Sequence, residues 1–300
     1  MTLKLNVLSV LLIVLAISCK TRMPADIIAE GAELELVSDG YKFTEGPASD
    51  AQGNVYFTDQ PNDRILKWST SGETTTWLQP CGRSNGLCFD ADGMLWACAD
   101  EKNEMWMIDQ KKNISVVVAH YGGRRLNGPN DVWITPDGGA YFSDPFYKRP
   151  YWDHDSTEQD CQGVYFLASP EAELKQVVND LVQPNGIIGT PDSNTLYVTD
   201  IRDKKTYSYD IQGDGTLGDK KLFCAMGSDG MTLDDQGNVY VTGKGVTVFD
   251  KTGQKIKHIE VPEDWTANVC FGGPDMNYLF ITAKKGLYRI KMNVKGIGSQ

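Results

Sequence analysis

The stretch 85–100 reads NGLCFDADGMLWACAD, and five other stretches of the chain follow the same pattern. Each begins with a polar opening residue, usually followed by glycine, and continues with a short apolar run, a turn of the type Asp-x-x-Gly and an aromatic-rich strand. In all six, the aromatic residue of the second strand follows the opening residue by 11 or 12 positions. The other stretches are 45–59, 130–144, 185–200, 229–243 and 268–283. Six matches in one register identify internal repeats.

Each repeat continues with further strand-like runs, for example 64–68 and 74–78 in the first and 104–108 and 114–119 in the second. Four short strands per repeat is the composition of a propeller blade. The repeats start 40, 45, 55, 44 and 39 residues apart, which fits blades with one insertion in the third. No stretch after residue 20 has helical periodicity over three turns. The sequence therefore predicts an all-β, six-bladed β-propeller with four antiparallel strands in each blade.

The sixth repeat lacks a fourth strand, because only a glycine-containing tail follows 286–292. The segment 33–37, ahead of the first repeat, alternates like a strand and has no partner of its own. We expect this N-terminal strand to complete the last blade and close the ring, which would also cover a sheet edge. The predicted domains are a lipoprotein-type signal peptide at 1–19, a tether at 20–31 and the propeller at 32–300.

The start of the chain has the pattern of an export signal. Lys4 precedes the apolar run 5–18, which is too short to span a bilayer comfortably and ends in small residues before Cys19. The pattern resembles a bacterial lipobox, in which Cys19 is lipidated and becomes the mature N-terminus. The alternative is an ordinary signal peptide that contains a cysteine. We expect an exported, membrane-anchored bacterial lipoprotein that faces the periplasm or cell surface and contacts the membrane only through its lipid.

The charge of the chain excludes one class of partner. With 29 Lys and Arg against 40 Asp and Glu, the net charge is −11, so no basic surface for a nucleic-acid backbone is expected. The six cysteines other than Cys19 include no CxxC motif and no spacing that favours pairing across a tight hairpin. We expect free, buried thiols. No Gly-x-Ser-x-Gly motif is present, which argues against a serine hydrolase.

The opening residues should meet at one end of the central channel, because the first strand of each propeller blade lines it. They comprise two carboxylates and four amides, with no histidine or cysteine: Glu45, Asn85, Asn130, Asn185, Asp229 and Asn268. Oxygen ligands of this kind select a hard divalent cation such as Ca²⁺. Each asparagine could instead make only an Asx turn. Glu45 favours the cation, because glutamate is a poor turn residue and a buried carboxylate needs compensation.

At these positions the chain resembles the gluconolactonase and senescence-marker-protein (regucalcin) family of six-bladed propellers. The motifs that carry the resemblance run from residue 45 to residue 273: Glu45-Gly46-Pro47, the run RLNGPND at 125–131, Pro184-Asn185-Gly186, the run SDGM at 228–231 and the run CFGG at 270–273. The resemblance implies that Glu45, Asn185 and Asp229 bind a divalent metal, and that Asn130 completes the site or holds the substrate. It also implies that Asp229 activates water. Ca²⁺ is the first expectation, with Mg²⁺, Mn²⁺ or Zn²⁺ as alternatives.

The insertion in the third repeat contains the aromatic-rich segment 144–154, DPFYKRPYWDH. It should join the second and third strands of that blade, on the face that carries the opening residues, and we expect it to form a lid over them. The aspartates that end second strands recur in four repeats, so a turn role is expected for them: Asp59, Asp100, Asp144 and Asp200.

The leading functional hypothesis is a metal-dependent hydrolase of a small-molecule sugar lactone or related cyclic ester. The alternative is a non-catalytic propeller that binds a partner through its rim while a structural cation braces the ring.

Overall fold

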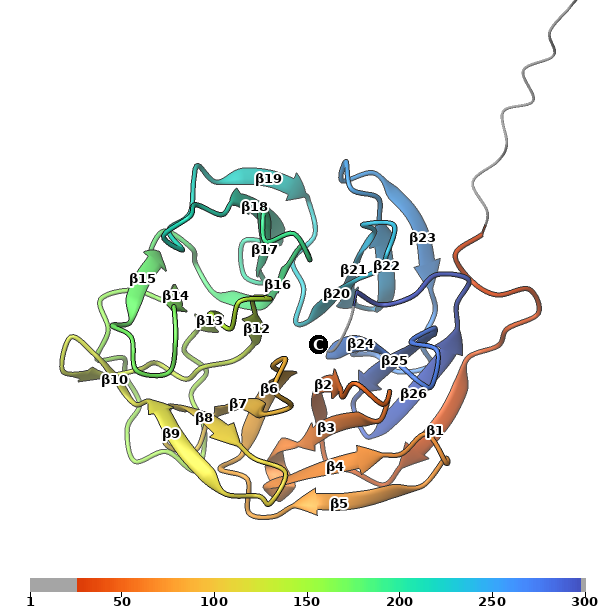
Figure 1. Ribbon diagram of the computed structural model, residues 1–300, viewed down its shortest axis with the longest axis horizontal. Helices are drawn as coiled ribbons and strands as arrows, with labels where there is room; N and C mark the ends of the chain where they lie inside the picture. The colour runs from red at the N-terminus through yellow and green to blue at the C-terminus, as the bar shows by residue number, and fades with distance from the viewer. Residues whose placement is uncertain (1–25, 298–300) are drawn as a thin grey trace, which may run out of the picture.

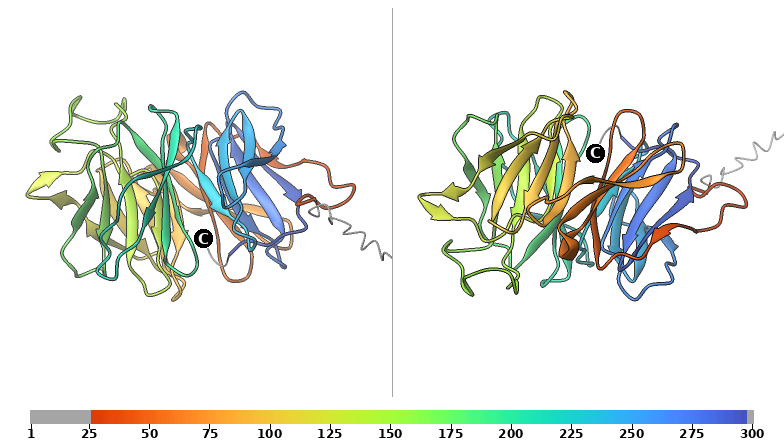
Figure 2. Two further views of the ribbon diagram at one scale, coloured as in Figure 1. Left: turned by 90° about the horizontal axis from the view of Figure 1, so that it is seen from above. Right: turned by 90° about the horizontal axis from the view of Figure 1, so that it is seen from below.

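The computed structural model describes residues 26–297 and confirms the predicted architecture. Six four-stranded antiparallel sheets surround a central channel, in the order of the chain (Figure 1). Each sheet runs from an inner strand at the channel to an outer strand at the rim, and Figure 2 shows the ring from its edges. The first three blades contain β2 (Thr44–Ser49), β3 (Val55–Asp59), β4 (Arg64–Trp68) and β5 (Thr74–Leu78); β6 (Ser84–Phe89), β7 (Leu95–Ala99), β8 (Glu104–Ile108) and β9 (Ile114–Val118); and β12 (Val132–Ile134), β13 (Ala140–Asp144), β14 (Gly163–Leu167) and β15 (Lys175–Val178).

The other three blades complete the ring. They contain β16 (Pro184–Gly189), β17 (Thr195–Asp200), β18 (Lys205–Asp210) and β19 (Lys221–Cys224); β20 (Met231–Leu233), β21 (Val239–Gly243), β22 (Gly245–Phe249) and β23 (Lys255–Ile259); and β24 (Asn268–Gly272), β25 (Tyr278–Ala283), β26 (Gly286–Lys291) and β1 (Glu35–Asp39). A short hairpin of β10 (His120–Tyr121) and β11 (Arg124–Arg125) links the second and third blades, and one turn of 3₁₀ helix, η1 (Gln60–Asn62), follows β3.

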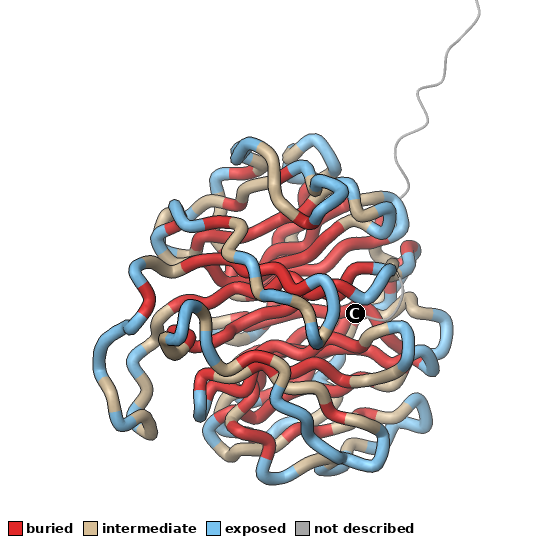
Figure 3. The backbone as a smooth tube through the Cα atoms, turned by 60° about the vertical axis from the view of Figure 1, so that its left-hand side comes forward, coloured by how far each residue is buried: buried red, intermediate tan, exposed pale blue. Residues whose placement is uncertain are grey.

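Burial decreases from the channel outward (Figure 3). Every residue of the inner strands β2, β6, β16 and β24 is buried, whereas three of the five residues of the outer strand β9 are exposed. Inner strands lack the usual alternation because neighbouring blades cover both of their faces. Packing between blades uses aromatic rings: Trp133 of the third blade lies over Gly189 of the fourth, where a Cβ atom would sit 2.2 Å from the ring.

The N-terminal strand closes the ring as predicted. β1 pairs antiparallel with β26, from Glu35 opposite Arg289 to Asp39 opposite Gly286, with a bulge between Leu36 and Ser38. The strand begins at Glu35, two positions later than the alternation indicated. The last described residues lie near the centre of the ring, where Gly296 pairs with Asp234, the residue after β20.

The folded domain begins earlier than the predicted boundary at residue 32. Ile27 is 6% exposed in the core of the last two blades, and Ile28 pairs with Met292. Residues 26–31, expected in the tether, therefore pack on the sixth blade because Ile27 buries its apolar side chain there. The predicted signal peptide and Cys19 lie outside the described residues.

Two further observations concern the described part of the chain. The six cysteines between residues 26 and 297 are all free, and only Cys161 is not buried, which confirms the expectation from their spacing. None of the described helices is long and apolar enough to cross a membrane.

Candidate active site

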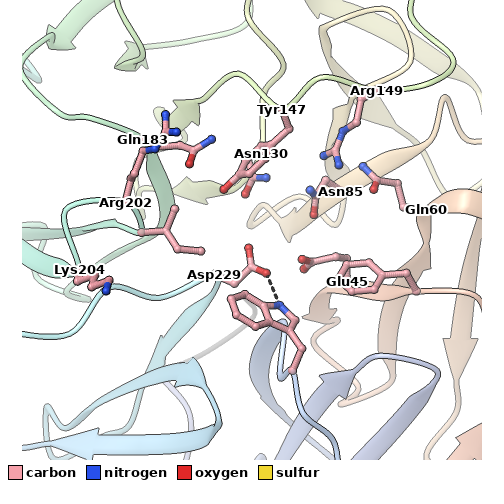
Figure 4. Close-up of a pocket in the computed structure, with 13 residues that line it drawn as sticks. Glu45, Gln60, Asn85, Asn130, Tyr147, Arg149, Gln183, Arg202, Lys204 and Asp229 are labelled. Atoms are coloured by element: carbon pink, nitrogen blue, oxygen red, sulfur yellow. Dashed lines mark hydrogen bonds between the residues drawn. The ribbon is translucent and has the colours of Figure 1, made fainter.

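The opening residues lie at one end of the channel, around a cavity of about 490 Å³ (Figure 4). Glu45, Asn85, Asn130 and Asp229 line this cavity, and Asn185 donates a hydrogen bond through Nδ2 to Asp229 Oδ1 at 2.8 Å. Five of the six opening residues therefore form one polar site. Asn268 points elsewhere: it lines a separate small cavity in the channel, with its Nδ2 3.5 Å from Asp131 Oδ2.

Bulges and close backbone contacts place these side chains. The inner strands β2, β6 and β16 each shift register beside the opening residue, at Glu45/Ala48, Ser84/Leu87 and Pro184/Ile187. Such bulges re-aim side chains at the ends of strands. Gly46, at φ +37°, lies so close to the next blade that a Cβ atom there would be 2.1 Å from the carbonyl oxygen of Asn85. The glycine that follows the opening residue in the sequence pattern thus allows adjacent blades to meet at the mouth.

Glu45 and Asp229 are two carboxylates without a Lys or Arg ion pair among the described residues. Glu45 is 3% exposed, and its Oε2 accepts a hydrogen bond from the Gly46 N–H at 3.0 Å. Burial raises its pKa well above the usual range, and the neighbouring charge of Asp229 raises it further. Burial also raises the pKa of Asp229, which accepts hydrogen bonds from Asn185 and from Trp265 Nε1, the latter at 2.8 Å.

Asn185 carries an unsatisfied acceptor beside these carboxylates. Its Nδ2 group donates to Asp229 and to the hydroxyl oxygen of Tyr147, each at 2.8 Å, whereas its buried Oδ1 has no hydrogen-bond partner. Buried polar atoms without partners are rare and indicate a missing ligand, ion or water. No group of three or more His, Cys, Asp or Glu side chains that could hold a metal occurs between residues 26 and 297. A cation here would be held by two carboxylates together with amide oxygens, which suits hard ions.

The loop 145–162 joins β13 to β14 and contributes Tyr147 and Arg149 to the cavity. Asp100 anchors it: the carboxylate accepts hydrogen bonds from Arg149 Nε at 2.8 Å and from the Tyr151 hydroxyl, and its backbone oxygen accepts one from Trp152 Nε1 at 2.7 Å. The position expected for the insertion is therefore correct. Asp100 differs from the other strand-ending aspartates. Asp59, Asp144 and Asp200 each accept backbone N–H groups of the segment before the first strand of their blade. Their role is structural, as expected, but these bonds link segments 16 to 18 positions apart and do not form a turn.

Several residues of the cavity wall were not predicted from the sequence. They come from loops that follow strands or precede them: Phe43, Gln60, Gln183, Ile201, Arg202, Lys204 and Trp265. A partial signal existed for Gln60 and Ile201, since each directly follows the aspartate that ends the second strand of its blade. Trp265 lies three residues before the opening residue of the sixth repeat, and no pattern in the sequence marks it.

The fold and the site define a class: a six-bladed propeller with a buried, oxygen-rich polar site at one mouth of its channel. The chain belongs to the family described as the SMP-30/gluconolactonase/LRE-like region, which matches residues 43–285. This confirms the resemblance drawn from the motifs.

Named relatives support the assignment over most of the chain. The gluconolactonase of Zymomonas mobilis is 28% identical over 90% of this chain and 84% of that protein. The structure of a gluconolactonase from Xanthomonas campestris superposes with a TM-score of 0.83, is 29% identical and covers 89% of this chain and 91% of that one. Diisopropyl-fluorophosphatase of Loligo vulgaris is 25% identical over 82% of this chain and 87% of that protein.

Proposed function

We propose that this protein is a metal-dependent hydrolase that opens a sugar lactone or related cyclic ester. The observation that carries the proposal is the unpartnered Oδ1 of Asn185 beside two buried carboxylates, at a cavity of about 490 Å³. A cavity of this size holds a small molecule. Kinship with gluconolactonases supports the reaction class.

The donor set fits a hard divalent ion. Glu45, Asn185 and Asp229 would hold it, with Asn130 as a fourth ligand or as a contact to the substrate. Ca²⁺ is the first candidate, and Mg²⁺, Mn²⁺ and Zn²⁺ are the alternatives. When bound, the cation would polarise the ester carbonyl and offset the two negative charges.

Asp229 is the proposed base. Its two oxygens are oriented by Trp265 and Asn185, which holds the carboxylate in position to accept a proton. Asp229 would take one proton from a water molecule as the water oxygen bonds to the acyl carbon. The bond from that carbon to the ring oxygen then breaks, and the ring oxygen takes the proton back from Asp229, which regenerates the carboxylate. The product is an open-chain hydroxy acid.

The test is acid release from aldonolactones in weak buffer, with spontaneous hydrolysis subtracted. The protein is assayed after chelation and after addition of each candidate cation, while circular dichroism reports its fold. We expect turnover that disappears with chelator and returns with a cation while the strand signal persists. No turnover above the blank on any lactone or aryl ester, in protein supplied with every cation, would reject the hydrolase and favour the non-catalytic binding propeller.

A further inference from the structure

The wall of the cavity carries three cationic side chains, although the whole chain has a net charge of −11. Arg149 comes from the loop 145–162, and Arg202 and Lys204 come from the turn between β17 and β18. Figure 4 shows Arg149 on one side of the cavity and the other two cations on the opposite side, with Asp229 between them. Cationic side chains therefore border the two carboxylates on opposite sides.

Arg202 and Lys204 have no ion pair within residues 26–297. The charged residues next to them, Asp203 and Lys205, pair with each other: Lys205 Nζ lies 3.1 Å from Asp203 Oδ2. Asp203 Oδ2 also accepts a hydrogen bond from the Tyr207 hydroxyl at 2.5 Å. Arg202 and Lys204 are exposed and line the cavity. The turn thus leaves two positive charges without a partner at the mouth.

A comparison of equivalent turns in the repeats supports a separate role for Lys204. The residue before the third strand has a positive φ in the first, second and fourth blades, where it is Asp63, Asn103 and Lys204. Asp63 accepts the N–H groups of Cys81 and Arg83, and Asn103 donates to the carbonyl oxygen of Asn127 at 2.9 Å. Both side chains therefore hold the segment that leads into the first strand of the next blade. Lys204 makes no such bond in the described chain and lines the cavity instead.

Arg149 is fixed in place and keeps free donors. Its Nε donates to Asp100, and its guanidinium lies 5.2 Å from the centre of the Tyr147 ring. Among the described residues its two terminal nitrogens have no hydrogen-bond partner. A guanidinium held in this way presents two parallel donors, which matches a carboxylate or a phosphate.

We propose that the lactone bears an anionic substituent, a carboxylate or a phosphate, which Arg202 and Lys204 bind on one side of the cavity while its acyl carbon lies toward Asp229 and the free donors of Arg149 face the ring from the other side. This inference rests on the proposed function and narrows its substrate class. Asp100 offsets the charge of Arg149, and a divalent cation would offset Glu45 and Asp229. The remaining charges on Arg202 and Lys204 would then be balanced by the substrate. Attraction to these two side chains would keep the anionic end at the rim and so orient the ring.

The test compares matched lactones. Glucono-δ-lactone is paired with its phosphorylated form, and glucono-γ-lactone with the γ-lactone of glucaric acid, so each pair differs in one anionic group. We expect kcat/KM to be roughly tenfold or more higher for the anionic member of at least one pair, since hydrogen bonds to charged groups have this magnitude. The pair that shows the preference identifies phosphate or carboxylate. The preference should shrink as salt is added, because both rim side chains are exposed.

Variants assign the preference to residues. The double variant Arg202→Gln/Lys204→Gln should lose about tenfold more kcat/KM on the anionic lactone than on its neutral partner. Arg149→Gln, on the opposite side of the cavity, should lower kcat/KM on both members of a pair alike. Because it also releases Asp100, the exposed double variant carries the test. The matched control is Lys205→Gln, which removes a neighbouring lysine outside the cavity and should keep the preference.

Two outcomes separate this inference from the proposed function. Hydrolysis of neutral lactones at least as fast as of anionic ones, with no selective loss in the double variant, overturns the inference and leaves the hydrolase intact. No hydrolysis of any lactone overturns the proposed function. In that case, calorimetric titration with the γ-lactone of glucaric acid and with phosphorylated glucono-δ-lactone tests whether Arg202 and Lys204 bind an anionic group. If the wild type binds either anionic lactone and the double variant does not, the anion site is supported. If the wild type binds neither, the anion site is rejected.

Discussion

Glu45 and Asp229 are both buried carboxylates, but their hydrogen-bond partners differ. Glu45 accepts a bond at Oε2 from the N–H of its own neighbour, Gly46, whereas both oxygens of Asp229 accept bonds from side chains of other segments. Asp229 is thus held in one orientation by donors from two other parts of the chain. Different environments for two acids in one site indicate different tasks.

The first prediction separates these tasks. Glu45→Gln keeps the shape and removes one charge, so the main loss should be cation affinity, and excess cation should restore much of the rate. Asp229→Asn removes the proton acceptor, and a general base contributes roughly 10² to 10⁴ in rate. Excess cation should not recover that loss. The measurement is lactone turnover against cation concentration, with melting curves as the folding control. Full recovery of Asp229→Asn by cation would contradict the role of base.

The second prediction concerns Asp144, which is fully buried and accepts the backbone N–H groups of Asn127 and Gly128. Burial raises its pKa to about 7, and the two N–H groups oppose that rise without cancelling it. The Asp144 carboxyl group therefore binds its proton more tightly in the folded protein than in the unfolded chain. The resulting stability is present in acid and is lost as the pH rises toward 7.

Asp144→Asn should remove this pH dependence. The unfolding free energy of the wild type minus that of the variant should fall by on the order of 1 kcal/mol per pH unit between about pH 5 and 7. Chemical denaturation at fixed cation concentration measures it, and Asp92→Asn, at an exposed aspartate, is the control for loss of a carboxylate. A difference that stays constant over this range would show that Asp144 is already ionised throughout.

Sequence patterns predicted the residues that recur and missed those that do not. Glu45, Asn130, Asn185 and Asp229 were found because they occupy one position of a repeat. Trp265 and Arg202 lie in connections whose conformation depends on contacts between blades, and such contacts have no period in the sequence. Asn268 occupies the repeated position, yet its side chain turns to Asp131. Position in a repeat fixes where a backbone lies and leaves the direction of a side chain to its neighbours.

At the scale of elements, Asp100 is the hydrogen-bonding anchor of the loop 145–162 on the second blade. Asp100 receives three hydrogen bonds from this loop and a fourth from Gln60 Nε2 at 3.2 Å. Because Gln60 and Arg149 both line the cavity, Asp100 joins two parts of its wall. Asp100 is therefore a positioning residue for the loop.

The third prediction is that Asp100→Asn loosens this loop. The amide keeps one acceptor and loses the charge that pairs with Arg149, so local opening should increase by roughly tenfold. Limited digestion with trypsin, which can cleave after Lys148 but not after Arg149 because Pro150 follows it, should accelerate accordingly, and KM should rise more than kcat falls. The matched control is Asp153→Asn in the same loop, at a side chain that is 93% exposed. Equal digestion of Asp100→Asn and the wild type would contradict the anchor.

Strand positions were predicted well where alternation is regular. The expected strands at 64–68, 74–78 and 104–108 coincide with β4, β5 and β8. β1 was placed two residues early, because its limits depend on which residues pair with the distant strand β26, and that pairing leaves no mark on the local pattern.

At the scale of the whole molecule, the ring is closed by one strand. β1 covers the edge of β26, and Ile27 adds apolar burial beside it. A chain without these residues would expose an unpaired edge.

The fourth prediction tests closure by truncation. Protein that begins at Asp26 retains all described contacts and should melt like the full chain. Protein that begins at Tyr41 lacks β1 and Ile27, and it should melt at a lower temperature and aggregate through the edge of β26. Thermal melts and light scattering of the two proteins give the comparison. Identical melting without aggregation would refute closure by β1.

The fifth prediction concerns Cys19, which we propose to be the lipid-bearing N-terminus of an exported protein. Lipidated protein should fractionate with membranes and require detergent for release, since two or more acyl chains anchor stably. Cys19→Ala protein should appear in the soluble fraction. If Cys19→Ala protein is correctly cleaved and stays with membranes, the anchor is not a lipid on Cys19.

The pairing of β1 with β26 also sets the moment at which synthesis of this protein can yield its native state. Glu35 and Arg289, which form an ion pair across the closing strands, are 254 positions apart. A ribosome needs on the order of ten to fifty seconds to translate that distance. Five blades can assemble on the nascent chain, but the earliest strand must wait for the latest one. During this interval β1 is unpaired and accessible to chaperones and proteases. A codon change that slows translation of the last blade would prolong this exposure without altering the folded structure.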